Sequence, residues 1–121
     1  MALSKNLIDE CKARLLEAKE ELLNRANDTR KNLYSEEKGG DEGDQTVRAL
    51  AEREMLHMAD RIRRQLIEIE SALARIQNGT FGICEETDEN IEAERLKAIP
   101  WTRLSIEGAE LRESLGRRYA R

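Results

Sequence analysis

The sequence predicts a mostly α-helical protein whose main element is a long antiparallel helical hairpin, a coiled coil. Two stretches, residues 3–34 and 45–77, carry apolar side chains at spacings of three and four, the repeat of one face of a helix. Residues 35–46 between them hold three glycines and an excess of acidic side chains, a composition typical of a turn. Two long helices joined by a short loop bury their apolar faces most simply against each other.

The composition supports this fold class and excludes several functions. Charged residues make up 38% of the 121 residues and aromatic residues 3%, which favours a long exposed helix over a large globular core. The net charge of −4 comes from interleaved acidic and basic residues, so no basic patch predicts direct, sequence-specific DNA binding. No apolar run approaches twenty residues, which predicts a protein without membrane segments. We expect a cytoplasmic protein in which Cys11 and Cys84 are free thiols.

The first helix, over residues 3–34, presents one apolar stripe. Its members are Ile8, Cys11, Leu15, Ala18 and Leu22, and Leu7, Leu16 and Leu23 widen it. In an antiparallel hairpin, Cys11 then lies opposite roughly residue 69, at the end of the hairpin near the C-terminal lobe.

The second helix, over residues 45–77, has the most regular pattern in the chain. Its seam consists of Val47, Ala51, Met55, Met58, Ile62, Leu66, Ile69, Leu73 and Ile76. At ~1.5 Å per residue this helix is about 50 Å long. Asp44 is expected to be its N-cap, and Gly79 suits the left-handed position that ends it.

Residues 79–121 predict a small lobe followed by a C-terminal helix, and residues 1–78 predict the hairpin. A short helix is expected over residues 89–98 and a final helix over 105–119, with Ser105 as N-cap. The apolar side chains available to the lobe are Phe81, Ile83, Ile91, Leu96, Ile99, Trp101 and Leu104.

Two short segments of this lobe have the frame of a four-cysteine zinc ribbon. Residues 79–87 read as a first knuckle and residues 104–108 as a second, and a Cys-x-x-Cys pair in each would form a closed tetrahedral site. The four ligand positions hold instead Cys84, Thr87, Ser105 and Gly108. One thiolate cannot hold a structural zinc ion, so we expect no cofactor and a lobe stabilised by packing of Phe81, Ile83, Ile99 and Trp101.

Three segments together resemble the DksA/TraR family of bacterial RNA polymerase-binding transcription factors. They are residues 78–84 (Asn-Gly-Thr-Phe-Gly-Ile-Cys), residues 91–100 with Arg-Leu-Lys-Ala-Ile-Pro at their end, and residues 104–107 (Leu-Ser-Ile-Glu). Residues 41–46 resemble the family's tip motif Asp-x-x-Asp-x-Ala, with Thr46 in place of the alanine. The chain departs from the family at three of the four zinc-ligand cysteines.

The resemblance implies a function. Members of the family insert their helical hairpin into the secondary channel of RNA polymerase, where two tip aspartates act near the catalytic centre. Carried over here, these are Asp41 and Asp44, with Thr46 beside them. The factor would change the lifetime of promoter complexes as a monomer, without specific contact to DNA and without a membrane.

The resemblance also bears on regulation by the nucleotide ppGpp in the stringent response. Basic residues that hold ppGpp in responsive members fall on Glu68, Ile99 and Ala109 here, none of which binds phosphate well. Arg61 and Arg95 remain as matched basic positions. We therefore expect a response to ppGpp that is weak or absent.

Other interpretations of the same residues remain open. Asp41 and Asp44 can serve as a solvated loop and a helix cap, and the hairpin can be a helical adaptor or a homodimerising module without polymerase activity. An enzyme is not predicted, because the sequence offers no nucleophile–base pair, phosphate-binding loop or metal-ligand cluster. Cys84 reads as a small buried apolar side chain or a redox partner of Cys11, and the single histidine, His57, as a seam or surface residue.

Overall fold

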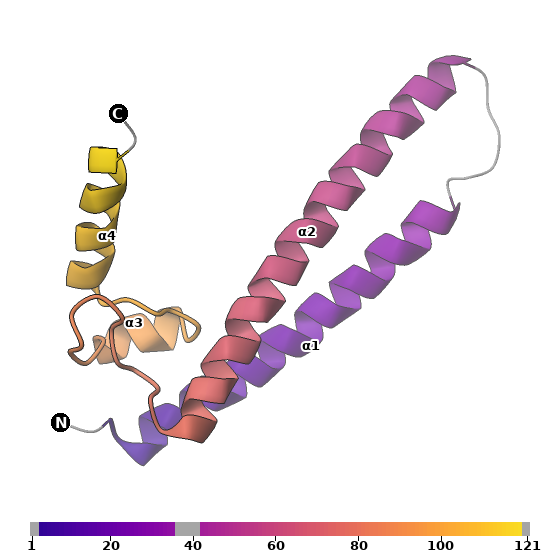
Figure 1. The fold of residues 1–121 in the computed structure, drawn as a ribbon. Helices are drawn as coiled ribbons and strands as arrows, with labels where there is room; N and C mark the ends of the chain where they lie inside the picture. Colours follow the sequence, from indigo (N-terminus) through magenta and orange to yellow (C-terminus); the bar gives the residue numbers. More distant parts are fainter. Residues whose placement is uncertain (1–2, 36–41, 120–121) are drawn as a thin grey trace. The chain divides into compact units, whose positions relative to one another are not determined.

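The computed structural model describes residues 3–35 and 42–119. It contains four helices: α1 (Lys5–Ser35), α2 (Glu42–Asn78), α3 (Ala93–Ala98) and α4 (Ile106–Tyr119), shown in Figure 1. These described residues contain no strand beyond one antiparallel bridge between Ile83 and Asn90. The mostly α-helical class predicted from the sequence is therefore confirmed. None of the described helices is long and apolar enough to cross a membrane.

The chain divides into two compact units. The first unit comprises Met1–Glu17 and Glu68–Arg121, and the second comprises Ala18–Ile67. Residues at the start of α1 and the end of α2 thus belong with the C-terminal segment. The division into 1–78 and 79–121 stays a prediction.

The core of the first unit combines side chains of α1, α2 and the lobe. Its buried members are Leu7, Cys11, Leu15, Ile69, Ala72, Phe81, Cys84, Ile91 and Leu96. The thiol of Cys11 is fully buried, and its Sγ lies 3.6 Å from the carbonyl oxygen of Leu96 in α3. Cys11 therefore contacts the C-terminal lobe, as its place in the stripe predicted.

One member predicted for the packing of the lobe is wrong. Ile83 is 42% exposed, whereas Phe81 is buried and Ile99 and Trp101 are half-buried. Ile83 forms the bridge with Asn90, and neighbouring side chains of extended backbone point to opposite faces. Because Cys84 points into the core, Ile83 faces solvent.

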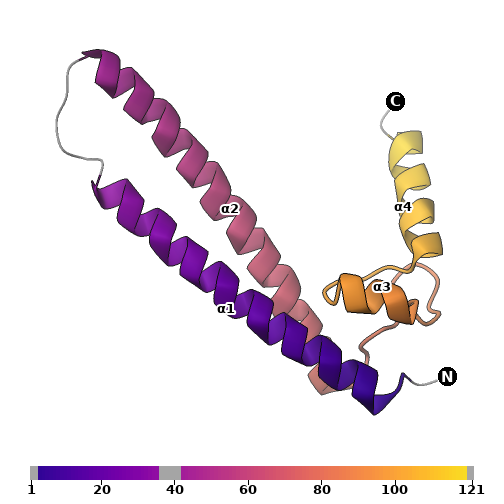
Figure 2. The ribbon, with the colours of Figure 1, turned by 180° about the vertical axis from the view of Figure 1, so that it is seen from behind.

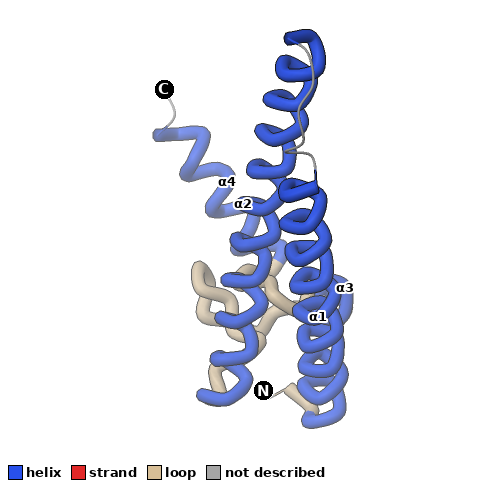
Figure 3. Tube along the Cα trace, turned by 90° about the vertical axis from the view of Figure 1, so that its right-hand side faces the viewer, coloured by secondary structure: helices blue, strands red, loops and turns tan. Residues whose placement is uncertain are grey.

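The second unit is a pair of antiparallel helical segments from α1 and α2 (Figures 2 and 3). Leu22 and Ile62 are buried, and the hydroxyl of Thr29 donates to the carbonyl of Arg25 at 2.9 Å and lies 3.8 Å from the sulfur of Met58. The predicted seam fails at two members: Val47 is 66% exposed and Met58 is 44% exposed. Met58 packs against the polar Thr29 of α1, so part of its side chain stays in contact with water.

The ends of the helices follow the predictions with two exceptions. Gly79 has φ +79° and its N–H donates to Ile76, while the N–H of Thr80 donates to Arg75, a Schellman ending of α2. Ser105 precedes α4, and its hydroxyl accepts the N–H of Gly108 at 3.0 Å, so this N-cap is confirmed.

The predicted N-cap at Asp44 and the start of α3 are wrong. Helix α2 already begins at Glu42, which puts Asp44 in its first turn, where a carboxylate interacts favourably with the helix dipole. Helix α3 begins at Ala93, because Asn90 is held in the bridge and Glu92 has an extended backbone. Residues 36–41, the rest of the predicted loop, lie outside the described residues.

We expect Gly79→Ala and Gly116→Ala to change stability in opposite directions. A Cβ at either position would meet no atom within 4 Å, so only backbone conformation differs. At Gly79 the left-handed φ costs an alanine about 1 kcal/mol, whereas in the interior of α4 alanine gains roughly 0.5 to 1 kcal/mol. Urea unfolding followed by circular dichroism measures both, and an unchanged Gly79→Ala protein would contradict the assigned ending of α2.

Candidate functional site

The four zinc-ribbon positions converge in the first unit. The Sγ of Cys84 is fully buried, and the Oγ of Ser105 donates a hydrogen bond to it over 3.4 Å. A Cβ built on Gly108 would collide with the same sulfur, so this backbone lies directly against it. Thr87, at the remaining position, lies near enough to the sulfur to lower the pKa of the Cys84 thiol. Cys84, Thr87, Ser105 and Gly108 therefore surround one point.

Local backbone geometry explains why the first knuckle turns as it does. The N–H of Cys84 donates to Glu89 at 2.8 Å, and the N–H of Asp88 donates back to the carbonyl of Cys84 at 2.9 Å. Asp88 takes a positive φ of 58°, a conformation that aspartate tolerates better than most residues. The turn keeps the form of a metal-binding knuckle with only one thiol in it.

These side chains do not fit a tetrahedral zinc ion. A structural site needs four donors, and only Cys84 offers a thiolate. The hydroxyl of Ser105 is already engaged, as donor to Cys84 and as acceptor from Gly108. At Gly108 the sulfur of Cys84 fills the space that a fourth ligand side chain would need. Within residues 3–35 and 42–119, no group of three or more His, Cys, Asp or Glu could hold a metal.

The two cysteines of the first unit have opposite acidities. Burial raises the pKa of the Cys84 thiol, but hydrogen bonds from the side chains and backbone of Ser105 and Thr87 outweigh it and lower the pKa to about 6. At Cys11, burial and the neighbouring Glu10 raise the pKa of the thiol, against smaller opposite effects of Arg14 and Lys97. Cys84 is thus the more acidic of the two cysteines, because hydrogen-bond donors face its sulfur, and Cys11 is the less acidic one.

Ion pairs that the sequence did not predict surround the two knuckles. Arg103 donates to Glu85 and Arg112 donates to Glu86, at Nη1–Oε1 3.0 Å and Nη2–Oε1 2.7 Å. The hydrogen bond from Arg103 lowers the pKa of the Glu85 carboxyl. One signal was present in the sequence: Glu85 and Glu86 directly follow Cys84, and Arg103 stands two residues before Ser105.

The predicted tip residues belong to the second unit. Asp44 and Thr46 are exposed in the first two turns of α2, and both make interactions there. Asp41 lies outside the described residues. Their assignment to a partner's active site therefore remains a prediction.

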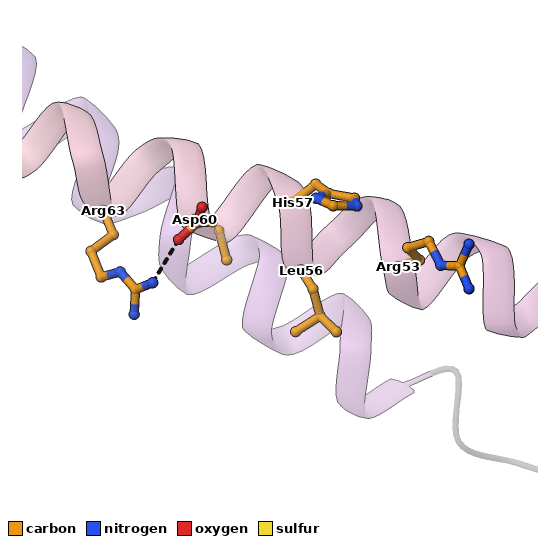
Figure 4. Close-up of a pocket in the computed structure, with 6 residues that line it drawn as sticks. Arg53, Leu56, His57, Asp60 and Arg63 are labelled. Carbon is orange, nitrogen blue, oxygen red and sulfur yellow. Dashed lines mark hydrogen bonds and ion pairs between the residues drawn. The ribbon is translucent and has the colours of Figure 1, made fainter.

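His57 lies in a shallow surface depression of the second unit. Figure 4 shows its lining, which comes from α2 alone: Arg53, Leu56, His57, Ala59, Asp60 and Arg63. Arg63 donates to Asp60 at 2.6 Å, and this hydrogen bond lowers the pKa of the Asp60 carboxyl. With arginines around it and no second histidine in the chain, His57 is poorly suited to hold a metal.

We expect the two thiols to titrate separately. Absorbance at about 240 nm should show one thiolate forming near pH 6, because the pKa of Cys84 is about 6. Cys84→Ser should remove this transition, while the matched variant Cys11→Ser should keep it. A single transition above about pH 8.5, the range of an ordinary thiol, would contradict the proposed donors around Cys84.

Stability should follow the same titration. The pKa of Cys84 is about 6 in the folded protein and about 8.5 in the unfolded chain. The ionised sulfur therefore contributes fully to the free energy of unfolding above pH ~8.5. This contribution is lost as the pH falls through about 6. The difference in unfolding free energy between the unsubstituted protein and Cys84→Ser should therefore be larger at high pH, by at least about 1 kcal/mol.

Known proteins resemble the chain along nearly its whole length. Residues 79–113 match the prokaryotic dksA/traR C4-type zinc finger. An uncharacterized protein of Aquifex aeolicus is 36% identical over 112 residues, which cover 89% of this chain and 77% of that relative. The RNA polymerase-binding transcription factor DksA of Caulobacter vibrioides is 38% identical over 107 residues, 84% of this chain and 72% of that protein.

A solved structure agrees with the fold. The transcription factor DksA2 from Pseudomonas aeruginosa superposes with a TM-score of 0.87 and 31% identity, over 94% of this chain and 88% of that one. The four-cysteine zinc finger named by the family match contrasts with the two cysteines of this chain. Identity of this extent and a shared helical fold together show that the chain belongs to the DksA/TraR family.

Proposed function

We propose that this protein is a transcription factor that binds RNA polymerase and inserts the loop end of its helical hairpin into the secondary channel. Membership of the DksA/TraR family carries the proposal, because a relative 38% identical is named an RNA polymerase-binding transcription factor. The bound factor changes the stability of promoter complexes. It has no enzymatic activity of its own and makes no sequence-specific contact with DNA.

The start of α2 supports this mode of action. Asp44 and Thr46 are exposed there, and the nearby Val47 and Leu50 are 66% and 57% exposed. Acidic and apolar side chains thus lie together on one helix end, where the partner helix leaves them uncovered. Helix α2 has 37 residues and a length of about 55 Å, enough to reach through a protein pore. In a channel that excludes bulk water, a carboxylate interacts more strongly with cations than in solution.

The first unit supports a weak response to ppGpp. Glu68, at a position where responsive members carry a basic residue, accepts two hydrogen bonds from Arg103, at 2.8 Å and 3.3 Å. Arg95 is a matched basic position, but its Nε donates to the carbonyl of Leu104 at 2.8 Å. The carboxylate of Glu68 repels a phosphate group of ppGpp. The guanidinium of Arg95 is already bonded to the backbone before α4.

Binding to core RNA polymerase tests the proposed function. The purified protein, as a monomer, should bind the polymerase and should be displaced by an established secondary-channel factor. Fluorescence anisotropy with a labelled factor measures this competition. Binding that such a factor does not displace would contradict the channel, and absence of binding at micromolar concentration would favour the adaptor. Light scattering supplies the matching readout, because an adaptor that pairs through its seam would be a dimer.

Replacing Asp41 and Asp44 with asparagine should abolish the effect on promoter-complex lifetime. Binding to polymerase should change by only a few-fold, because the rest of the hairpin still fills the channel. Asp28→Asn is the matched control, since Asp28 is an exposed aspartate of α1 in the same unit. Circular dichroism must show unchanged helicity, as Asp44 also contributes about 0.3 to 1 kcal/mol at the start of α2. Full activity of the double variant would refute the role of the two aspartates.

The same transcription assay tests the nucleotide response. Added ppGpp should alter the factor's effect on transcription by less than about twofold. A coupling free energy of 1 kcal/mol between ppGpp and the factor would already change that effect by roughly fivefold. A responsive family member serves as the positive control. A strong enhancement would refute the proposed insensitivity while leaving polymerase binding intact.

A further inference from the structure

We propose that two arginines close the zinc-ribbon lobe in place of the metal, so that the lobe folds without zinc and depends on charge instead. In a four-cysteine ribbon, the metal joins two knuckles that are distant in sequence. Here the same two segments are joined by Arg103 and Arg112 on one side and Glu85 and Glu86 on the other. The inference concerns folding of the first unit and does not rest on polymerase binding.

The contacts of Arg103 connect three parts of the first unit. Its Nη1 donates to Glu85 Oε1 at 3.0 Å, and its Nε donates to Glu68 Oε2 at 2.8 Å. Its Nη2 donates to Glu68 Oε1 at 3.3 Å and to Ser71 Oγ at 2.9 Å. A backbone hydrogen bond joins the same two segments, since the N–H of Glu85 donates to the carbonyl of Arg103 at 3.0 Å. Arg103 thus joins the first knuckle to the segment before the second knuckle and to α2.

The contacts of Arg112 close the other side. Its Nε and Nη2 both donate to Glu86 Oε1, at 2.9 Å and 2.7 Å, and its Nη2 lies 3.5 Å from Glu85 Oε2. Arg112 stands one turn after Gly108 in α4, so this pair fixes α4 to the first knuckle. Glu85 takes part in both sets of contacts, with one carboxylate oxygen toward each arginine.

These five residues form one charge clamp: Glu68, Arg103, Glu85, Arg112 and Glu86. Isolated ion pairs on a protein surface contribute little, but connected networks with two-point arginine contacts contribute more. The exposed fractions of these side chains run from 28% for Glu86 to 47% for Arg112, so water reaches the clamp and screens it in part. The two guanidinium groups together carry the charge of one divalent cation. At the centre, the Oγ of Ser105 reaches the sulfur of Cys84 over 3.4 Å, a longer and weaker link between the knuckles than the bonds of a zinc ion to its ligands.

Thermal unfolding of the full-length protein tests the clamp, with Trp101 as the probe. Trp101 is the only tryptophan of the chain and lies in the lobe, and its carbonyl accepts a hydrogen bond from Arg75. Arg103→Gln and Arg112→Gln should each lower the midpoint of the fluorescence transition, by about 4 °C or more for Arg103→Gln. The matched control is Arg117→Gln, because Arg117 pairs with Glu113 within α4 and joins no knuckle. This control should shift the midpoint by less than about 1 °C.

A double-mutant cycle keeps the test informative if Arg103→Gln fails to fold. Arg112 and Glu86 are the pair for it, and the double variant Arg112→Gln/Glu86→Gln should shift the midpoint by less than the sum of the two single shifts. Additive shifts, or variants no less stable than Arg117→Gln, would overturn the clamp.

Metal and salt complete the test on the unsubstituted protein. Added zinc or a chelator should leave the midpoint unchanged, and metal analysis should find no stoichiometric zinc. Raising potassium chloride from about 0.05 M to about 1 M should lower the midpoint toward that of the variants, because salt screens the partly exposed charges. Bound zinc, a chelator-sensitive midpoint or a midpoint indifferent to salt would each overturn the proposal.

Discussion

The C-terminal lobe depends on one constraint: two knuckles must close around a single buried sulfur. The hydroxyl of Ser105 meets this constraint in two ways, since it donates to Cys84 and accepts the N–H of Gly108, the bond that caps α4. Gly108 is needed because any side chain there would collide with the sulfur. The start of α4 is therefore set at the sequence positions that in a four-cysteine zinc finger hold metal ligands. With one cysteine at these four positions, the centre is closed by hydrogen bonds.

The same region joins the lobe to α2 through two arginines. Arg75 donates from α2 to the carbonyls of Trp101 and Thr102, and Arg103 donates from the lobe to Glu68 and Ser71. The bonds of Arg75 satisfy two backbone carbonyls in the segment before α4, and the bonds of Arg103 join that segment to side chains of α2. Glu68 is therefore a structural residue of the first unit, and the proposed weak response to ppGpp depends on the same carboxylate.

Most of the fold could be predicted because its signals are local. Apolar spacing predicted α1 and α2, Gly79 predicted the end of α2, and Ser105 predicted the start of α4. The errors have specific causes. Val47 and Met58 were placed in a buried seam from the apolar pattern of α2 alone, and that pattern does not say which side chains of α1 face it. Asp44 was read as a cap, although a carboxylate within the first turn satisfies the same preference for negative charge.

The candidate site shows where sequence alone was sufficient and where it was not. The four ribbon positions could be found from their spacing, because that spacing encodes two tight turns, and a turn is determined by a few consecutive residues. The partners of Arg103 and Arg112 could not be found in this way. In a chain with 38% charged residues, every arginine has many possible carboxylates, and pairs such as Arg103–Glu68 span 35 positions. By itself, the sequence determined the helices, their ends and the vestigial knuckles, and only the tertiary structure decided which charges meet, because pairing across distant segments depends on how the backbone is folded.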